Sequence, residues 1–144
     1  MMGCPYCASP EIQERKIVEN ELAFAFRGSM PIVPGHTLVA PKRHIAKYEN
    51  LTEEEMRAIE NLRVKMLGAL TKTFSAKGFN FAWNDEKLAG QSVPHFHLHI
   101  VPRKEEDVGI YEYEPRQFLY RPGERETSPE AELREVAKLI IKNL

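Results

Sequence analysis

The sequence has no long hydrophobic run, few cysteines and almost no net charge, and each shortage excludes a class of protein. No stretch of its 144 residues approaches the ~20 apolar residues that span a bilayer. The first residues lack the basic and apolar regions of a secretory signal, so we expect a cytoplasmic protein without membrane contact. The formal net charge is -1, from 20 basic and 21 acidic residues. This balance makes a nucleic-acid polymer an unexpected partner, whereas a small anionic ligand needs only a local site.

The length and composition indicate one soluble domain with a single core. Hydrophobic residues make up 42% and charged residues 28% of the chain, as in an ordinary globular protein. Alternation of apolar with small or polar residues predicts strands at 21–27, 79–83 and 95–101. A further short strand, closed by a proline, is expected at 37–41.

Two helices are predicted from their start signals and spacing. Thr52-Glu53-Glu54-Glu55 is a capping box, and the apolar stripe that follows predicts a long helix ending at Gly78 as a left-handed cap. Ser128-Pro129-Glu130 begins a second helix. Because the strands come in adjacent pairs, we expect an α+β fold, with an antiparallel sheet, a long helix packed on it and a C-terminal helix extension.

Three of the five histidines alternate along one predicted strand. His95, His97 and His99 would share a face, roughly 6.6 Å apart and exposed. A single buried histidine is usually a core residue whose ring nitrogens have hydrogen-bond partners, but three on one strand are poorly explained in this way. Two functional interpretations remain, a three-histidine metal site and catalysis by neutral imidazole. Residues 90–92 (Gly-Gln-Ser) offer donors for phosphate oxygens, and no Asp or Glu lies at positions 87–104 to support metal ligands. Catalysis is therefore the favoured interpretation.

The only two cysteines form a Cys-x-x-Cys motif at Cys4 and Cys7. In a reducing compartment this spacing indicates metal or redox use rather than a structural disulfide. A redox pair normally follows a strand and starts a helix, and no strand pattern precedes Cys4. Zinc is therefore favoured over a metal-free thiol pair, and a closed zinc site needs four ligands.

Two motifs resemble the histidine-triad (HIT) superfamily. Residues 90–103 read GQSVPHFHLHIVPR and resemble its signature, in which histidines alternate with apolar residues. Residues 34–44 read PGHTLVAPKRH and resemble its other hallmark, the loop and strand before the long helix. The resemblance covers about residues 4–103, the core of a single HIT-like domain spanning 1–144. The remainder, about 104–144, is a C-terminal extension with no specific correspondence.

The resemblance implies a nucleotidyl hydrolase or transferase that cleaves nucleoside phosphoanhydrides or phosphoramidates at the α-phosphate. His97 resembles the nucleophile, which forms a covalent nucleotidyl-histidine, and release then yields a nucleoside monophosphate. His99 resembles the histidine that contacts the phosphate. The substrate-binding residues that the resemblance implies are Asn84, Gly90, Gln91, Ser92, His36 and Phe26. For Phe26, a purely structural role in the hydrophobic core is an equally good interpretation.

The resemblance also implies a metal and a partner. Its zinc-containing members bind a structural zinc ion with a set that matches Cys4, Cys7, His44 and His95. It further implies a homodimer, in line with the long amphipathic helix and a sheet that one helix only half covers.

One position departs from the pattern, and two other functions stay open. Many members carry Asp or Asn, for the ribose hydroxyls, where this chain has Gly28. One alternative is a nucleotide-binding or interaction protein with little turnover. The other is a tri-histidine metalloenzyme, in which His95, His97 and His99 would all bind the metal.

Overall fold

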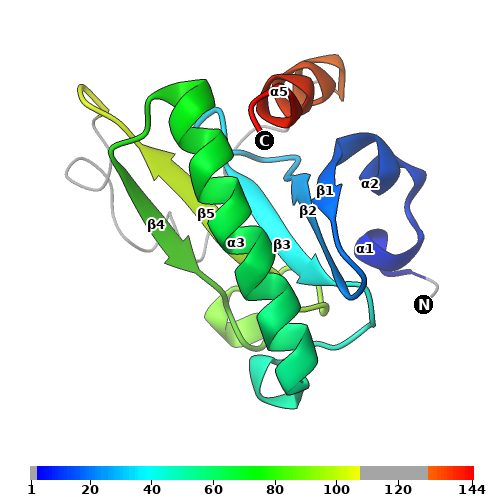
Figure 1. Ribbon diagram of the computed structural model, residues 1–144. Coiled ribbons are helices and arrows are strands. Elements are labelled where there is room, and N and C mark those ends of the chain that lie inside the picture. The colour runs from blue at the N-terminus through cyan, green and yellow to red at the C-terminus, as the bar shows by residue number, and fades with distance from the viewer. Residues whose placement is uncertain (1–2, 108–129) are drawn as a thin grey trace.

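The computed structural model describes residues 3–107 and 130–144, and its centre is an antiparallel sheet of five strands in the order β1-β2-β3-β5-β4 (Figure 1). The strands are β1 Lys16–Glu19, β2 Ala23–Arg27, β3 Thr37–Pro41, β4 Gly78–Ala82 and β5 Leu98–Arg103. The α-helices are α1 Pro5–Ala8, α2 Pro10–Arg15, α3 Glu53–Phe74 and α5 Glu130–Lys142, with short 3-10 helices η1 Tyr48–Asn50 and η2 Lys87–Ala89. Within the described ranges, no helix is both long and apolar enough to cross a bilayer.

The long helix α3 starts as the sequence predicts and ends earlier. The Thr52 hydroxyl accepts a hydrogen bond from the Glu55 amide, and the Glu55 carboxylate accepts one from the Thr52 amide, which confirms the capping box. The left-handed cap is Ser75, with φ of 55°, so the prediction of Gly78 was wrong. Gly78 is instead the first residue of β4, where it pairs with Arg103 of β5. The helix therefore has to end before Gly78 so that the chain can turn into the strand.

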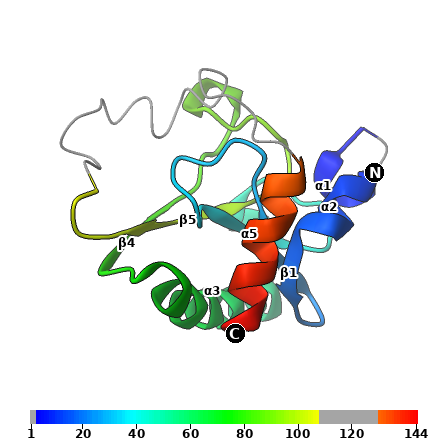
Figure 2. The same ribbon diagram turned by 90° about the horizontal axis from the view of Figure 1, so that it is seen from above.

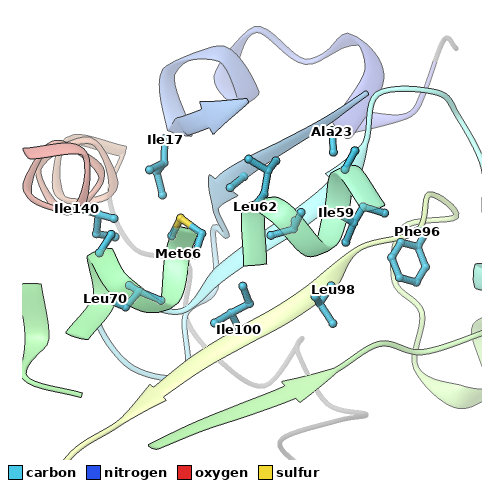
Figure 3. Close-up of a cluster of buried hydrophobic side chains, with 14 of the residues drawn as sticks. Ile17, Ala23, Ile59, Leu62, Met66, Leu70, Phe96, Leu98, Ile100 and Ile140 are labelled. Atoms are coloured by element: carbon cyan, nitrogen blue, oxygen red, sulfur yellow. The ribbon is translucent and has the colours of Figure 1, made fainter. Parts of the chain in front are cut away.

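The core lies between α3 and one face of the sheet (Figure 3). Small residues on β2, Ala23 and Ala25, let the helix approach closely, and Met66 and Leu70 are fully buried above the strands. Two aromatic residues of β2, Phe24 and Phe26, point to the opposite face, where α1 and α2 cover them. They form a second buried cluster there with Ile12, Leu38 and Ala40. The sheet is therefore covered on part of its second face as well, contrary to the single covering helix expected.

The histidine strand starts later than predicted. Strand β5 begins at Leu98, where it pairs with Val39 of β3. Farther along β3, Pro41 has no N–H for a ladder, and its carbonyl accepts a hydrogen bond from the His95 side chain at 2.7 Å instead. Residues 95–97 thus precede the strand, although apolar and histidine side chains still alternate there. The short elements α1, α2 and β1 were not predicted, since none is long enough to show a period.

The C-terminal helix α5 confirms the predicted extension and packs beside α3 and β1 (Figure 2). Its buried residues are Leu133, Ala137 and Ile140. The predicted start at Ser128-Pro129 and most of the 104–127 segment lie outside the described residues.

Candidate active site and metal centre

Two cysteines and two histidines converge beside α1. The ligand atoms of Cys4, Cys7, His44 and His95 all lie within 4.8 Å of one another. The Sγ–Nδ1 distances are 3.5 Å for Cys4–His95, 3.4 Å for Cys7–His95 and 3.3 Å for Cys7–His44. A tetrahedral zinc ion with Zn–S of about 2.3 Å and Zn–N of about 2.0 Å separates sulfur from nitrogen by about 3.5 Å. The four predicted ligands therefore fit a closed Cys2His2 site.

Hydrogen bonding and burial put His95 in the form that binds a metal. The ring is fully buried, and its Nε2 lies 2.7 Å from the Pro41 carbonyl, which can only accept. The proton is therefore on Nε2, and the Nδ1 lone pair faces the two sulfurs. Burial lowers the pKa of His95, which favours this neutral form. Burial raises the pKa of Cys4, so this thiol keeps its proton unless a cation draws it off.

The second triad histidine, His97, is separate from this cluster. Its side chain is 6% exposed and its Nδ1 lies 2.7 Å from the main-chain carbonyl of His95. Nδ1 therefore carries the proton, and Nε2 keeps a lone pair that can act as a nucleophile. Burial lowers the pKa of His97, which favours the neutral ring. The expectation of three exposed imidazoles was wrong for His95 and His97, because α1 covers this face and the Tyr6 ring stands edge-on 5.1 Å from the His97 ring.

His99 is paired with His36 through a bond whose proton can be assigned. The Ile32 amide donates to His36 Nδ1 at 2.9 Å, so the proton of neutral His36 is on Nε2. That Nε2 lies 3.0 Å from His99 Nδ1 and donates to it. The proton of neutral His99 is therefore on its own Nε2. The centroids of the His97 and His99 rings lie 5.1 Å apart, so the two imidazoles are neighbours.

One small cavity, of about 70 Å³, collects several of the predicted residues. His97, His99, His36, Ser92 and Phe26 all line it. Phe26 is fully buried within the second hydrophobic cluster, so it is at once a core residue and a wall of this cavity.

Three other predicted substrate-binding residues form the loop before the triad and do not line the cavity. The Asn84 amide lies 3.4 Å from the Gly90 carbonyl, and Gly90 has a φ of 101°. The Gln91 side chain donates to the Ala46 carbonyl at 2.9 Å and accepts from the Glu86 amide at 3.1 Å. These bonds fix the loop that carries Ser92 into the cavity, and direct phosphate contact by these three residues stays a prediction.

Two residues that line the cavity, Tyr6 and Arg15, were not predicted from the sequence. The place of Tyr6 between two metal ligands was a usable signal, since those ligands fix its backbone. Arg15 is held by an ion pair with Glu130 of α5, a contact across 115 positions that no local pattern reveals.

Comparisons with known proteins identify a family model, sequences and a solved structure that are similar to this chain. The HIT domain model matches residues 9–106. The bis(5'-adenosyl)-triphosphatase of Dictyostelium discoideum is 36% identical over 110 residues, covering 76% of this chain and 70% of that protein. The adenosine 5'-monophosphoramidase hnt1 of Schizosaccharomyces pombe is 32% identical over 111 residues, covering 76% and 80%. The crystal structure of a zinc-bound histidine triad family protein from Mycobacterium smegmatis matches with a TM-score of 0.67 and 28% identity, over 95% of this chain and 94% of that one.

Proposed function

This chain belongs to the HIT domain family, and on that premise we propose that it is a nucleotidyl hydrolase or transferase acting at the α-phosphate of a nucleotide. The observation that carries the proposal is the tautomer of His97. Its Nδ1–H donates to the His95 carbonyl, so the Nε2 lone pair is available as a nucleophile in a cavity shared with His99 and Ser92.

The reaction proceeds in two displacements. His97 Nε2 attacks the α-phosphorus, a P–N bond forms, and the bond to the leaving group breaks, with its electron pair going to that group. The phosphorylated ring is cationic, and the His95 carbonyl that accepts from Nδ1–H stabilises this charge. Water or another acceptor then attacks the same phosphorus, releases the nucleoside monophosphate and restores His97. Two easier steps replace one difficult displacement.

Neighbouring donors stabilise the charge that develops on the phosphate. His99 presents its Nε2 proton because His36 occupies its Nδ1, and the Ser92 hydroxyl lines the same cavity. Phe26 supplies an apolar wall that suits a nucleobase. Asn84, Gly90 and Gln91 are proposed to contact the phosphate or the leaving group once substrate orders the loop.

Zinc at Cys4, Cys7, His44 and His95 is proposed as a structural ion. The ligands come from α1 and its cap, from the segment after β3 and from the segment before β5, so the ion joins three parts of the chain. When bound, it supplies stability and fixes the backbone of His95, whose carbonyl orients His97. No ligand position is left for substrate in a four-ligand site.

The proposed substrates are dinucleoside polyphosphates or nucleoside phosphoramidates, the compound classes after which the Dictyostelium discoideum and Schizosaccharomyces pombe relatives are named. The cavity of about 70 Å³ is well below the roughly 300 Å³ of typical small-molecule sites. A nucleoside therefore requires Tyr6 or the loop at 28–34 to move. Gly28 lines the cavity without a side chain, so ribose hydroxyls must find other partners there.

The test incubates zinc-loaded protein with diadenosine tetraphosphate and with adenosine phosphoramidate, and measures adenosine monophosphate by chromatography. His97→Ala is the matched variant, with its zinc content and circular dichroism compared with the wild type. We expect release by the wild type alone, and a trapped nucleotidyl-peptide containing His97 after acid-free quenching and mass spectrometry. Equal release by both proteins would overturn the proposal.

Two alternatives predict different results in the same experiment. Calorimetric binding of adenosine monophosphate without turnover of either substrate supports the binding protein with little activity. The tri-histidine metalloenzyme requires His97 and His99 to hold the ion, whereas the described residues place only His95 of the triad in the metal cluster. Zinc retained by His97→Ala therefore counts against it.

A homodimer is proposed through the open edge of the sheet. Strand β4 lies at this edge and carries exposed aromatic residues, Phe81 and, just after it, Trp83. They border an apolar groove of about 530 Å³ against α3. An exposed apolar edge strand is a ready surface for a second copy of the chain. Light scattering should give twice the chain mass, and Phe81→Glu should give the monomer; a monomeric wild type would overturn this proposal.

A further inference from the structure

A buried arginine, Arg27, is hydrogen-bonded to the main chain of His36, the partner of His99. Arg27 is the last residue of β2, and its side chain lies on the face opposite Phe26, next to Thr37 of β3. It is 2% exposed, and its Nη1 donates to the His36 carbonyl at 2.8 Å. The guanidinium therefore touches the main chain of the residue that sets the proton of His99.

This arginine has an unfavourable environment for a residue that serves stability alone. Its Nε has no hydrogen-bond partner, and neither has the neighbouring Thr37 hydroxyl. In the part of the chain that the structure describes, no carboxylate lies within ion-pair distance of Arg27. Glu132 of α5 acts on it only at longer range, and burial lowers the pKa of Arg27 to about 10. A buried charge with one hydrogen bond is usually less stable than an apolar residue of similar size.

The hydrogen bond that Arg27 makes connects it, through His36, to His99 in the proposed substrate cavity. Its donor holds the His36 carbonyl, and the Ile32 amide holds the His36 ring from the loop side. Together they fix both the backbone and the ring of His36, whose Nε2–H then reaches His99 Nδ1.

We propose that Arg27 is a positioning residue for the reaction, because it holds the His36 carbonyl and thereby keeps His36 where its ring sets His99 as an Nε2–H donor toward the phosphate. The proposal rests on the proposed function for its effect on turnover. Its structural part, the single tautomer of the His36–His99 pair, does not depend on any substrate.

The test separates this role from a merely structural one by measuring stability, turnover and tautomer in the same variants. Arg27→Met removes the donor and the charge; Arg27→Lys keeps both in a different shape. Arg134→Met is the matched control, since Arg134 makes an exposed ion pair with Glu14 at 3.0 Å. Each protein is zinc-loaded and checked for metal content, thermal midpoint, kcat and KM. Long-range 1H–15N spectra of the imidazoles report which ring nitrogens carry protons.

For Arg27→Met we expect a thermal midpoint equal to or above that of the wild type. We expect kcat to fall about 10- to 100-fold, the range typical when a partner that orients a metal-binding histidine is lost, with little change in KM. The spectra should show mixed tautomers of His36 and His99. Arg27→Lys should recover at least part of kcat and of the single tautomer, and Arg134→Met should match the wild type throughout.

Two results would overturn the inference. One is wild-type kcat and an unchanged single tautomer in Arg27→Met. The other is a fall in thermal midpoint and kcat together while the spectra stay unchanged, which marks a structural role. If Arg27→Met does not fold, Arg27→Lys decides by the same spectra. If the wild type turns over neither substrate, the proposed function fails, and the spectra still decide whether Arg27 controls the His36–His99 pair.

Discussion

Loss of one metal ligand should uncouple the protein's thermal stability from zinc. The Sγ–Nδ1 distances of 3.3–3.5 Å agree with the tetrahedral expectation to within about 0.2 Å. We therefore expect zinc to bind with little rearrangement and its binding free energy to add to the free energy of unfolding. With free zinc at roughly 1,000 times its dissociation constant, this stabilisation is about 4 kcal/mol. For a domain of this length, that raises the thermal midpoint by about 10 °C.

The assay is calorimetry of the wild type and Cys4→Ser, each with zinc and after chelation, together with elemental analysis. We expect one zinc per wild-type chain, a fall of about 10 °C on chelation, and a Cys4→Ser midpoint near that of the chelated wild type. Ser9→Ala, just beyond α1, is the control and should keep the full zinc response. A Cys4→Ser protein that still binds one zinc and gains the same stability from it would refute the reasoning.

Three further predictions concern the scaffold. Gly35→Ala should destabilise the fold by about 2–4 kcal/mol in denaturant titrations, because φ is +97° and a Cβ would lie 2.9 Å from the Phe74 ring; a midpoint equal to that of the wild type would contradict it. Glu55→Gln should cost about 2 kcal/mol at pH 7, because the Arg43 guanidinium lowers the pKa of Glu55 from 4.5 to about 2. That stabilisation is present above pH 4.5 and lost as the pH falls toward 2, so the difference from the wild type should vanish there; a constant difference would be contrary. Met66→Ala should lower the free energy of unfolding by about 2–5 kcal/mol while keeping kcat at low temperature, since Met66 is fully buried in the core beneath α3 and does not line the cavity.

Local patterns were enough for the main elements, and the family resemblance was enough for the residues of the candidate metal cluster. The capping box at Thr52 predicted the start of α3, because its two hydrogen bonds lie within one turn. The short segment closed by Pro41 predicted β3, and the paired strands predicted an antiparallel sheet. The resemblance assigned Cys4 and His95 to one metal site before any distance was known, and the structure brings their ligand atoms together.

Burial and direction of hydrogen bonds depended on contacts that no local pattern contains. The three triad histidines look alike in sequence, yet one faces two sulfurs, the next donates to a main-chain carbonyl and the third accepts from another ring. Each role is decided by a partner from a distant segment or by the turn of the chain before β5. The same holds for Tyr6 over His97, and for Arg15 held by α5.

The sequence alone determined the fold class and the family, because periodicity, caps and a motif of fixed spacing are local properties, and through the resemblance it predicted His97 as the nucleophile. Only the tertiary structure decided which nitrogen of each triad histidine carries the proton and which residues enclose the cavity. It also decided that Arg27 is hydrogen-bonded to the His36 carbonyl. Those properties arise where segments far apart in the chain meet, and there burial and the available donors and acceptors leave one arrangement of protons satisfied.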